Sequence, residues 1–333
     1  MTTITPNWLL DPARPKRASS VPPGVEYHRV LAGEKSSIGR GILAIVMLLA
    51  GFVIFPTGLG ALTGLIDLQN GYTTPVFQGT DYTPLYHASS MLSLFLLMPW
   101  SMLIQRWLYG VPGASMHSVI SRFRFDLLGK SLLVFGPFWI LANAVGYFGP
   151  SVEVPWTQFD LITIFIGTVL LTPLQTAGEE YGVRGLLFRV LGSWTRGRKT
   201  GLVLGVIGSS AIFTAVHMST DIYINVWYFV LALCLAIITW RTGGIEIAVV
   251  LHAVLNTFSL VAGPLFRIDL GGALSDRSAG VGSVTQLIPT AAAILITLVI
   301  LWWTRKVGPV LTPTAASATA DAGAGADVVA SGK

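Results

Sequence analysis

The sequence predicts an all-α, polytopic membrane protein with about eight transmembrane helices. Of its 333 residues, 53% are hydrophobic and 11% are charged, whereas soluble domains carry about 25% charged residues. The mean hydropathy is +0.68, and the apolar residues occur in runs long enough to cross a bilayer, which takes about 20 residues of helix. We therefore expect lipid, rather than water, around most of the chain.

Eight apolar segments predict the spans, and two polar tails flank them. Residues 1–38 are rich in Pro, Ser and basic residues and are predicted to form a disordered cytoplasmic tail. Residues 306–333 are rich in Ala, Gly, Ser and Thr and are predicted to form a flexible cytoplasmic tail. Between them, the transmembrane domain at 39–305 contains the predicted spans 39–65, 86–108, 127–148, 159–188, 201–219, 222–241, 244–263 and 285–304.

The distribution of charge predicts the orientation. With both termini in the cytoplasm, 18 of the 21 Lys and Arg residues lie on the cytoplasmic side, as the positive-inside rule requires. The chain is therefore predicted to be a multi-pass protein of the plasma membrane. Its net charge of +5 is spread over short connections rather than gathered in a basic patch, which argues against nucleic acid as a partner. Cys234 is the only cysteine, so an internal disulfide and a cysteine-rich metal site are excluded.

Three charged residues lie inside the fourth apolar segment. A charge near the bilayer centre costs at least about 2.5–3.5 kcal/mol, so it is kept where it is paired, faces a cavity or does chemistry. Glu180 and Arg184 are four residues apart and share one helical face, where they can neutralise each other. Glu179 is rotated by about 100° from Glu180. It is therefore predicted to face a different partner.

Further polar side chains lie in the fifth and seventh segments. His217 lies near the end of the fifth, and His252 and Asn256 share one face of the seventh. Glu179 and His217 lie nineteen residues before and after Arg198, so an antiparallel hairpin would place them at one height. A carboxylate can take a proton from water, an imidazole can bind a metal or orient the water, and an amide can stabilise an oxyanion. Together these residues predict a hydrolytic site.

These residues carry a resemblance to a known family. The chain resembles the CPBP family of membrane proteins, which includes the CAAX prenyl endopeptidases and bacteriocin-processing proteins. The resemblance covers roughly residues 160–260 and rests on three motifs on separate spans, in the order of the family. They are EExxxR at 179–184, FxxxH at 213–217 and HxxxN at 252–256.

The resemblance implies an eight-helix intramembrane metalloendopeptidase that cleaves a membrane-associated peptide or a lipidated protein near the cytoplasmic side. Glu179 and His217 would activate the water, and His252 with Asn256 would stabilise the oxyanion. Two mechanisms stay open for the family. Either zinc is held by Glu179, His217 and His252, which suffice for an open catalytic zinc site, or a glutamate acts without a metal. By the same resemblance, the supporting residues would be Glu180, Arg184 and Phe213.

Other functions fit parts of the same pattern. Glu180 and Arg184 can form an ion pair with a structural role only, and a lone membrane histidine more often links helices than catalyses. The alternative function is therefore a non-catalytic membrane scaffold or bacteriocin-immunity factor with the same fold. A transporter would use the buried charges as an ion pathway, but the sequence shows no matching pair of broken helices.

Overall fold

The protein is a bundle of long helices. The computed structural model describes residues 21–145, 154 and 156–314, and this part of the chain contains helices and two isolated β-bridges but no strand. Eight helical segments in it are long and apolar enough to cross a membrane, which confirms the predicted fold class. They are Ile38–Gln69, Pro84–Tyr109, Phe125–Ala144, Gln158–Gly192, Arg198–Val216, Ile222–Thr242, Glu246–Phe266 and Val284–Trp303.

Three of these spans are composite, and the last joins a 3₁₀ turn (Val284–Gln286) to α11 (Leu287–Trp303). The second contains α2 (Pro84–Phe95) and α3 (Leu97–Tyr109). The fourth contains α5 (Gln158–Glu180), a π-helix (Tyr181–Leu187) and the short α6 (Phe188–Gly192). The other helices are α1 (Ile38–Gln69), α4 (Phe125–Ala144), α7 (Arg198–Val216), α8 (Ile222–Thr242), α9 (Glu246–Phe266) and α10 (Leu270–Ser275).

Local sequence signals set several helix ends. Thr157 and Asp160 form a capping box at the start of α5, which satisfies two backbone N–H groups at once. Asp221 accepts from the first-turn N–H groups of α8. Gly243 ends α8 with a φ of +67°, a left-handed conformation that glycine adopts without steric cost.

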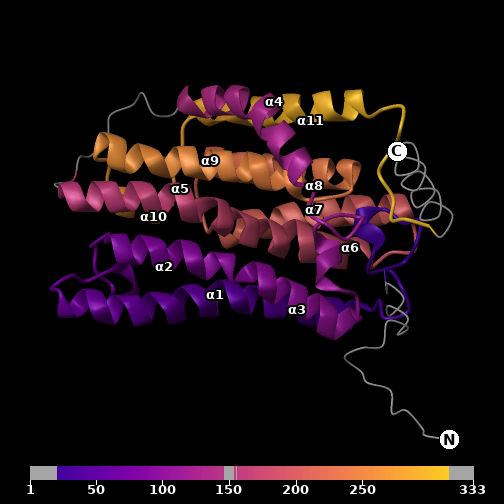
Figure 1. Cartoon of the computed structure of the whole chain (residues 1–333), viewed down its shortest axis with the longest axis horizontal. Helices are drawn as coiled ribbons and strands as arrows, with labels where there is room; N and C mark the ends of the chain where they lie inside the picture. Colours follow the sequence, from indigo (N-terminus) through magenta and orange to yellow (C-terminus); the bar gives the residue numbers. More distant parts are fainter. Residues whose placement is uncertain (1–20, 146–153, 155, 315–333) are drawn as a thin grey trace, which may run out of the picture.

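The two ends of the bundle differ in composition. At the end on the right of Figure 1, the chain segment before α1 and the segment after α11 lie together, next to α6. The connection between α1 and α2 lies at the opposite end. Arg122, Arg124 and Arg196 belong to the connections of the first end, and Arg198 and Lys199 are the first residues of α7 there.

Residues 21–37 are folded, in contrast to the predicted disordered tail at 1–38. Tyr27 is fully buried, donates a hydrogen bond of 2.5 Å to the backbone oxygen of Met116 and lies under the guanidinium of Arg189 at 3.9 Å. The segment also pairs with Thr312, whose N–H donates to the backbone oxygen of Val25 at 2.9 Å. Ordered structure thus begins earlier and ends later than composition indicated. Residues 1–20 and 315–333 of the predicted tails lie outside the described residues.

Close packing of α5 against its neighbours fixes the position of its polar end. A Cβ at Gly178 would collide with the backbone of Leu94 and Phe95, so the absence of a side chain lets the end of α2 approach α5 directly. On another side, the beginning of α9 is fixed by Glu246, whose buried carboxylate binds the guanidinium of Arg124 through two hydrogen bonds of 2.8 and 2.7 Å. The polar ends of α5 and α9 are therefore anchored independently.

Candidate active site

The two adjacent glutamates lie where α5 changes into a π-helix. Glu179 and Glu180 are the last residues of α5, and the π-helix begins at Tyr181. Both are buried, with 8% and 0% of their surface exposed. Such π-helical turns are rare and occur frequently at functional sites, because the extra residue per turn re-aims the side chains. The EExxxR motif therefore coincides with a local departure from regular helix.

Glu180 binds two groups at the same time. Its Oε1 accepts from Arg184 Nη1 at 2.9 Å and lies 2.7 Å from His252 Nδ1 on α9. Because a carboxylate only accepts hydrogen bonds, Nδ1 is the donor to Glu180. In neutral His252, the other ring nitrogen, Nε2, is then left with its lone pair. Glu180 thus fixes the orientation and the tautomer of the imidazole.

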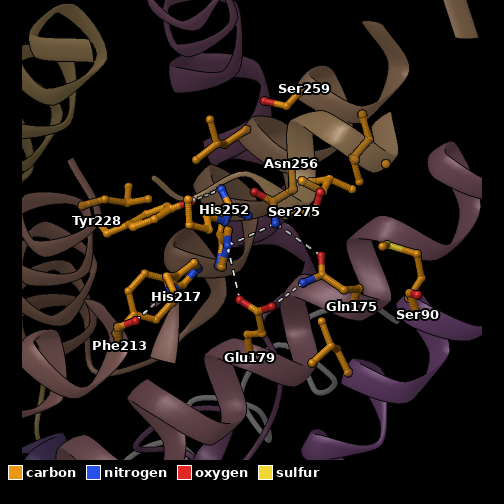
Figure 2. A pocket seen from close by; sticks show the side chains of 18 of the residues that line it. Ser90, Gln175, Glu179, Phe213, His217, Tyr228, His252, Asn256, Ser259 and Ser275 are labelled. Atoms are coloured by element: carbon orange, nitrogen blue, oxygen red, sulfur yellow. Dashed lines mark hydrogen bonds and ion pairs between the residues drawn. The ribbon is translucent and has the colours of Figure 1, made fainter. Parts of the chain in front are cut away.

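Glu179 faces a polar cluster formed by α5 and α9 (Figure 2). One carboxylate oxygen accepts from Gln175 Nε2 at 2.5 Å, and the other lies 3.6 Å from His252 Nε2. Asn256 Nδ2 lies 3.3 Å from Gln175 Oε1 and 3.3 Å from His252 Nε2. These four side chains form a closed ring of contacts in a buried region. A water held between Glu179 and His252 would lie within hydrogen-bond reach of both.

His217 approaches the cluster from α7. Its Nδ1 donates to the backbone oxygen of Phe213 at 2.7 Å and, in the neutral ring, leaves Nε2 as an acceptor. The imidazole packs between Phe213 and Tyr228, with ring centroids 4.6 and 4.0 Å away. Phe213 also lies beside His252, at 6.0 Å, and under Arg184, at 4.8 Å. Phe213 thus connects both histidines and the buried arginine.

All four predicted catalytic side chains line one cavity of about 510 Å³. Glu179, His217, His252 and Asn256 share it with apolar side chains of α2, α8 and α9, such as Met91, Trp227 and Leu255, which are part of its lining. A concave, mainly apolar site with a few convergent polar groups is typical of ligand and substrate pockets.

The predicted zinc ligands do not form a ligand set in this arrangement. Within the described residues, no group of three or more His, Cys, Asp or Glu side chains has a geometry that could hold a metal ion. Nδ1 of His252 is bonded to Glu180 and Nδ1 of His217 to the backbone of Phe213, which leaves Nε2 of each ring as the atom that a metal could use. As they lie, however, Glu179, His217 and His252 are not arranged as a three-ligand set, so the reaction proposed for them does not pass through a metal. Zinc stays a prediction.

The sequence prediction paired Glu179 with His217, whereas the described contacts pair it with His252. Among the described residues, no hydrogen bond or ion pair joins Glu179 to His217. Glu180, predicted as a supporting residue, is in direct contact with His252. Gln175 and Tyr228 are among the polar lining residues that the sequence analysis missed. Gln175 had a sequence signal, since it is a polar residue in an apolar span, four positions before Glu179.

Comparison with known proteins supports the resemblance seen in the motifs. The family model described as type II CAAX prenyl endopeptidase Rce1-like matches residues 158–258, which contain α5, the π-helix, α6, α7, α8 and most of α9. A comparison with curated proteins and one with solved structures gave no match. The matched segment contains the three motifs and the four cavity residues that they supply. Residues 158–258 are therefore similar to the type II CAAX prenyl endopeptidase family, in agreement with the resemblance of the three motifs to the CPBP family.

Proposed function

We propose that this protein is an intramembrane endopeptidase in which Glu179 activates a water that attacks a peptide bond of a membrane-associated substrate. The observation that carries the proposal is the buried contact of Glu179 with His252 and Gln175 beside a cavity. A carboxylate that is positioned next to a hydrogen-bonding imidazole can act as general base in a region of low dielectric constant.

The proposed reaction uses four polar side chains of the cavity, with Glu179 acting first as base and then as acid. Glu179 takes one proton from the water, while Nε2 of His252 accepts the hydrogen bond from its other proton. The oxygen forms a bond to the substrate carbonyl carbon, and Asn256 Nδ2 donates to the oxyanion. A single donor of this kind contributes about 3–4 kcal/mol of barrier lowering. Glu179 then gives its proton to the leaving nitrogen as the C–N bond breaks, and His217 Nε2 accepts an N–H of the substrate backbone.

Glu180 and Arg184 act as positioning residues in this mechanism. Glu180 keeps the Nδ1 proton of His252 in place, and Arg184 neutralises Glu180 within the same helical segment. Both side chains are fully buried, so neither can contact a substrate without rearrangement. A histidine that is oriented by a carboxylate in this way is a recurring arrangement in hydrolytic sites.

The experiment is a peptidase assay on the purified protein in detergent, with fluorogenic apolar peptides as probes. We expect Glu179→Gln to abolish turnover while the melting temperature stays near that of wild type. Glu34→Gln is the matched control, because Glu34 is an exposed glutamate far along the chain from the motifs. Full activity of Glu179→Gln would refute the mechanism. A folded wild type without any peptidase activity would instead favour the scaffold or immunity-factor alternative.

We further propose a plasma-membrane location with both termini in the cytoplasm, as the positive-inside rule indicates. This orientation has a consequence for the cavity. The connecting residues that line it include Pro75, Tyr82, Gly271 and Ser275, and they belong to the α1–α2 and α9–α11 connections. These connections lie at the end opposite the basic loops. In this orientation, the cavity is entered from the outer face rather than near the cytoplasm.

Cysteine labelling in intact cells tests this orientation. The only native cysteine, Cys234, is buried and is replaced by alanine to give a silent background. Ser275 and Thr200 are exposed residues of the two opposite ends. We expect a membrane-impermeant maleimide to label Ser275→Cys and to leave Thr200→Cys unlabelled until the cells are lysed. The reverse pattern would place the cavity mouth in the cytoplasm and refute the proposed orientation.

A further inference from the structure

One cation contributes to the wall of the catalytic cavity. Among the lining residues, Arg277 is the one Lys or Arg, and it lies just after α10 in the connection to α11. Its guanidinium donates one hydrogen bond, from Nη1 to the hydroxyl of Tyr228 at 3.2 Å. A guanidinium has five N–H donors in a planar fork, so most of its hydrogen-bonding capacity is left for other partners.

Arg277 forms no salt bridge within the described part of the chain, and its acidic neighbour is the exposed Asp276, whose pKa is lowered by hydrogen bonds from Ser278 and, to a smaller extent, by the charge of Arg277. The ion pairs found there do not include it. The neighbouring Asp276 directs Oδ1 to the N–H and hydroxyl of Ser278, at 3.0 and 2.7 Å. This contrasts with Arg124 and Arg184, which both bind a buried glutamate. The guanidinium of Arg277 therefore lies in the cavity wall without a salt bridge, and its acidic neighbour Asp276 is engaged with Ser278.

The backbone around Arg277 is held in place. Its carbonyl oxygen accepts from the backbone N–H of Thr220 at 2.9 Å and from the Thr220 hydroxyl at 3.2 Å. Gly280, three residues later, donates to Asp221 at 2.9 Å. These contacts attach the segment to the connection between α7 and α8. The guanidinium is thus presented from a fixed backbone rather than from a free loop.

Arg277 is also close to the proposed catalytic groups. The Tyr228 ring that receives its hydrogen bond lies 4.0 Å from the ring of His217, at an angle of 32°. One tyrosine side chain therefore separates the guanidinium from His217. An extended peptide advances about 3.3 Å per residue, so a substrate with its scissile bond at Glu179 would pass Arg277 within a few residues.

We propose that Arg277 binds a carboxylate of the peptide substrate, either its C-terminal α-carboxylate or an Asp or Glu side chain, and so determines specificity. The proposal rests on the peptidase function proposed above. Planar guanidinium groups bind carboxylates with two parallel hydrogen bonds. In a mainly apolar cavity, such a contact also fixes the direction in which the peptide lies across the site.

Two pairs of fluorogenic apolar octapeptides test the proposal. In the first pair, one peptide ends in a free acid and the other in an amide. In the second pair, both ends are blocked and one internal residue is Glu or Gln. We expect wild type to prefer the acid member of one pair by about tenfold or more in kcat/KM, mainly through KM, which is the order expected for a charge-assisted hydrogen bond. Which pair shows the preference identifies the source of the carboxylate.

Variants separate a binding role from a structural one. Arg277→Gln should reduce the acid preference to near one, and Arg277→Lys should keep part of it because the charge is retained. Tyr228→Phe removes the partner hydroxyl but not the charge, so it should keep the preference. The proposal is overturned if neither pair shows a preference, if Arg277→Gln retains it, or if Tyr228→Phe loses it as Arg277→Gln does.

A binding measurement keeps this test separate from the peptidase proposal. The same peptides, labelled with a fluorophore, are titrated with Glu179→Gln protein and with Glu179→Gln/Arg277→Gln protein, and anisotropy is recorded. If wild type cleaves no peptide, the peptidase proposal fails, yet anisotropy still reports on Arg277. At least tenfold tighter binding of an acid peptide, lost in the double variant, supports the inference. Equal binding of acid and neutral peptides overturns it.

Discussion

The buried ion pair of Glu180 and Arg184 gives the sharpest prediction. Both side chains are fully buried, and Nη1 of Arg184 donates to Oε1 of Glu180 at 2.9 Å. The substitution Glu180→Gln keeps the size of the side chain and an oxygen that can accept from His252. It removes the negative charge, however, so that Arg184 remains as a buried cation without a counter-charge.

The expected loss follows from this geometry. Removing one partner of a buried ion pair costs about 3–5 kcal/mol, because the other charge stays buried and unpaired. We expect the lower part of this range, since Oε2 of Glu180 and Nε of Arg184 have no hydrogen-bond partner and the pair is incompletely satisfied. At about 3 kcal/mol and 2–4 °C per kcal/mol for a large domain, Glu180→Gln should lower the melting temperature by about 6–12 °C.

The double variant Glu180→Gln/Arg184→Met is the matched control. It removes both charges, and replacing a complete buried pair by uncharged side chains is often close to neutral. We expect it to recover most of the lost melting temperature. Its kcat should nevertheless fall by about 10–100-fold with little change in KM, because His252 no longer has a charged partner on Nδ1.

Thermal melts in detergent and steady-state kinetics test both expectations on wild type, Glu180→Gln and Glu180→Gln/Arg184→Met. If Glu180→Gln has the melting temperature of wild type, the buried charge of Arg184 does not need Glu180 as its counter-charge. A double variant with full kcat would show that the carboxylate does not position His252. Either result refutes the corresponding step of the reasoning, and the two results are independent of each other.

Three further predictions follow from other parts of the molecule. Gly178→Leu should destabilise the protein by more than about 3 kcal/mol and abolish activity, because its side chain would push α2 away from α5. A melt and a peptidase assay check this, with Gly129→Leu as control, because an added Cβ at Gly129 meets no atom within 4 Å. Burial lowers the pKa of His28 to about 4, so between this value and about 6.5, the usual pKa, the unfolded chain binds a proton that the folded chain does not. The free energy of unfolding should therefore fall by up to about 3 kcal/mol as the pH drops from about 6.5 to 4. The melting temperature of His28→Gln, measured over the same pH range, should lack this part of the pH dependence. Prolonged treatment with a zinc chelator should leave the peptidase rate unchanged, and a loss of activity that added zinc restores would refute the metal-free mechanism.

The fold was predictable from the sequence to the level of its eight spans, because hydrophobic length alone determines which segments can cross a bilayer. The predicted spans differ from the structure mainly at their ends. The first extends to Gln69 instead of residue 65, and the fourth to Gly192 instead of 188. Residues 21–37 were missed for a different reason. Their order depends on tertiary contacts, such as Tyr27 with Arg189, which a local composition rich in Pro and Ser does not encode.

The composition of the site was predictable, but its pairing was not. Equal distances from the turn predicted Glu179 beside His217, which assumes two regular helices joined at the centre of their connection. The fourth span is not regular, because residues Tyr181–Leu187 form a π-helix with hydrogen bonds from i to i+5. The π-helix changes the rotation about the helix axis and the rise along it between Glu179 and the connection to α7. Sequence periodicity cannot register such a change. The role of His252 in stabilising the oxyanion came from the family resemblance and stays a prediction.

The pairing with His252 also explains how two adjacent glutamates can serve one site. Neighbouring helical residues point about 100° apart, so Glu179 and Glu180 cannot both face the same atom of a neighbouring helix. An imidazole has two nitrogens that point in diverging directions, and His252 directs Nδ1 to Glu180 at 2.7 Å and Nε2 towards Glu179 at 3.6 Å. One ring thus bridges the angle between the two carboxylates. A side chain with a single polar group at position 252 could contact only one of the two carboxylates. Replacing His252 in this way should therefore distinguish the positioning role of Glu180 from the proposed chemical role of Glu179.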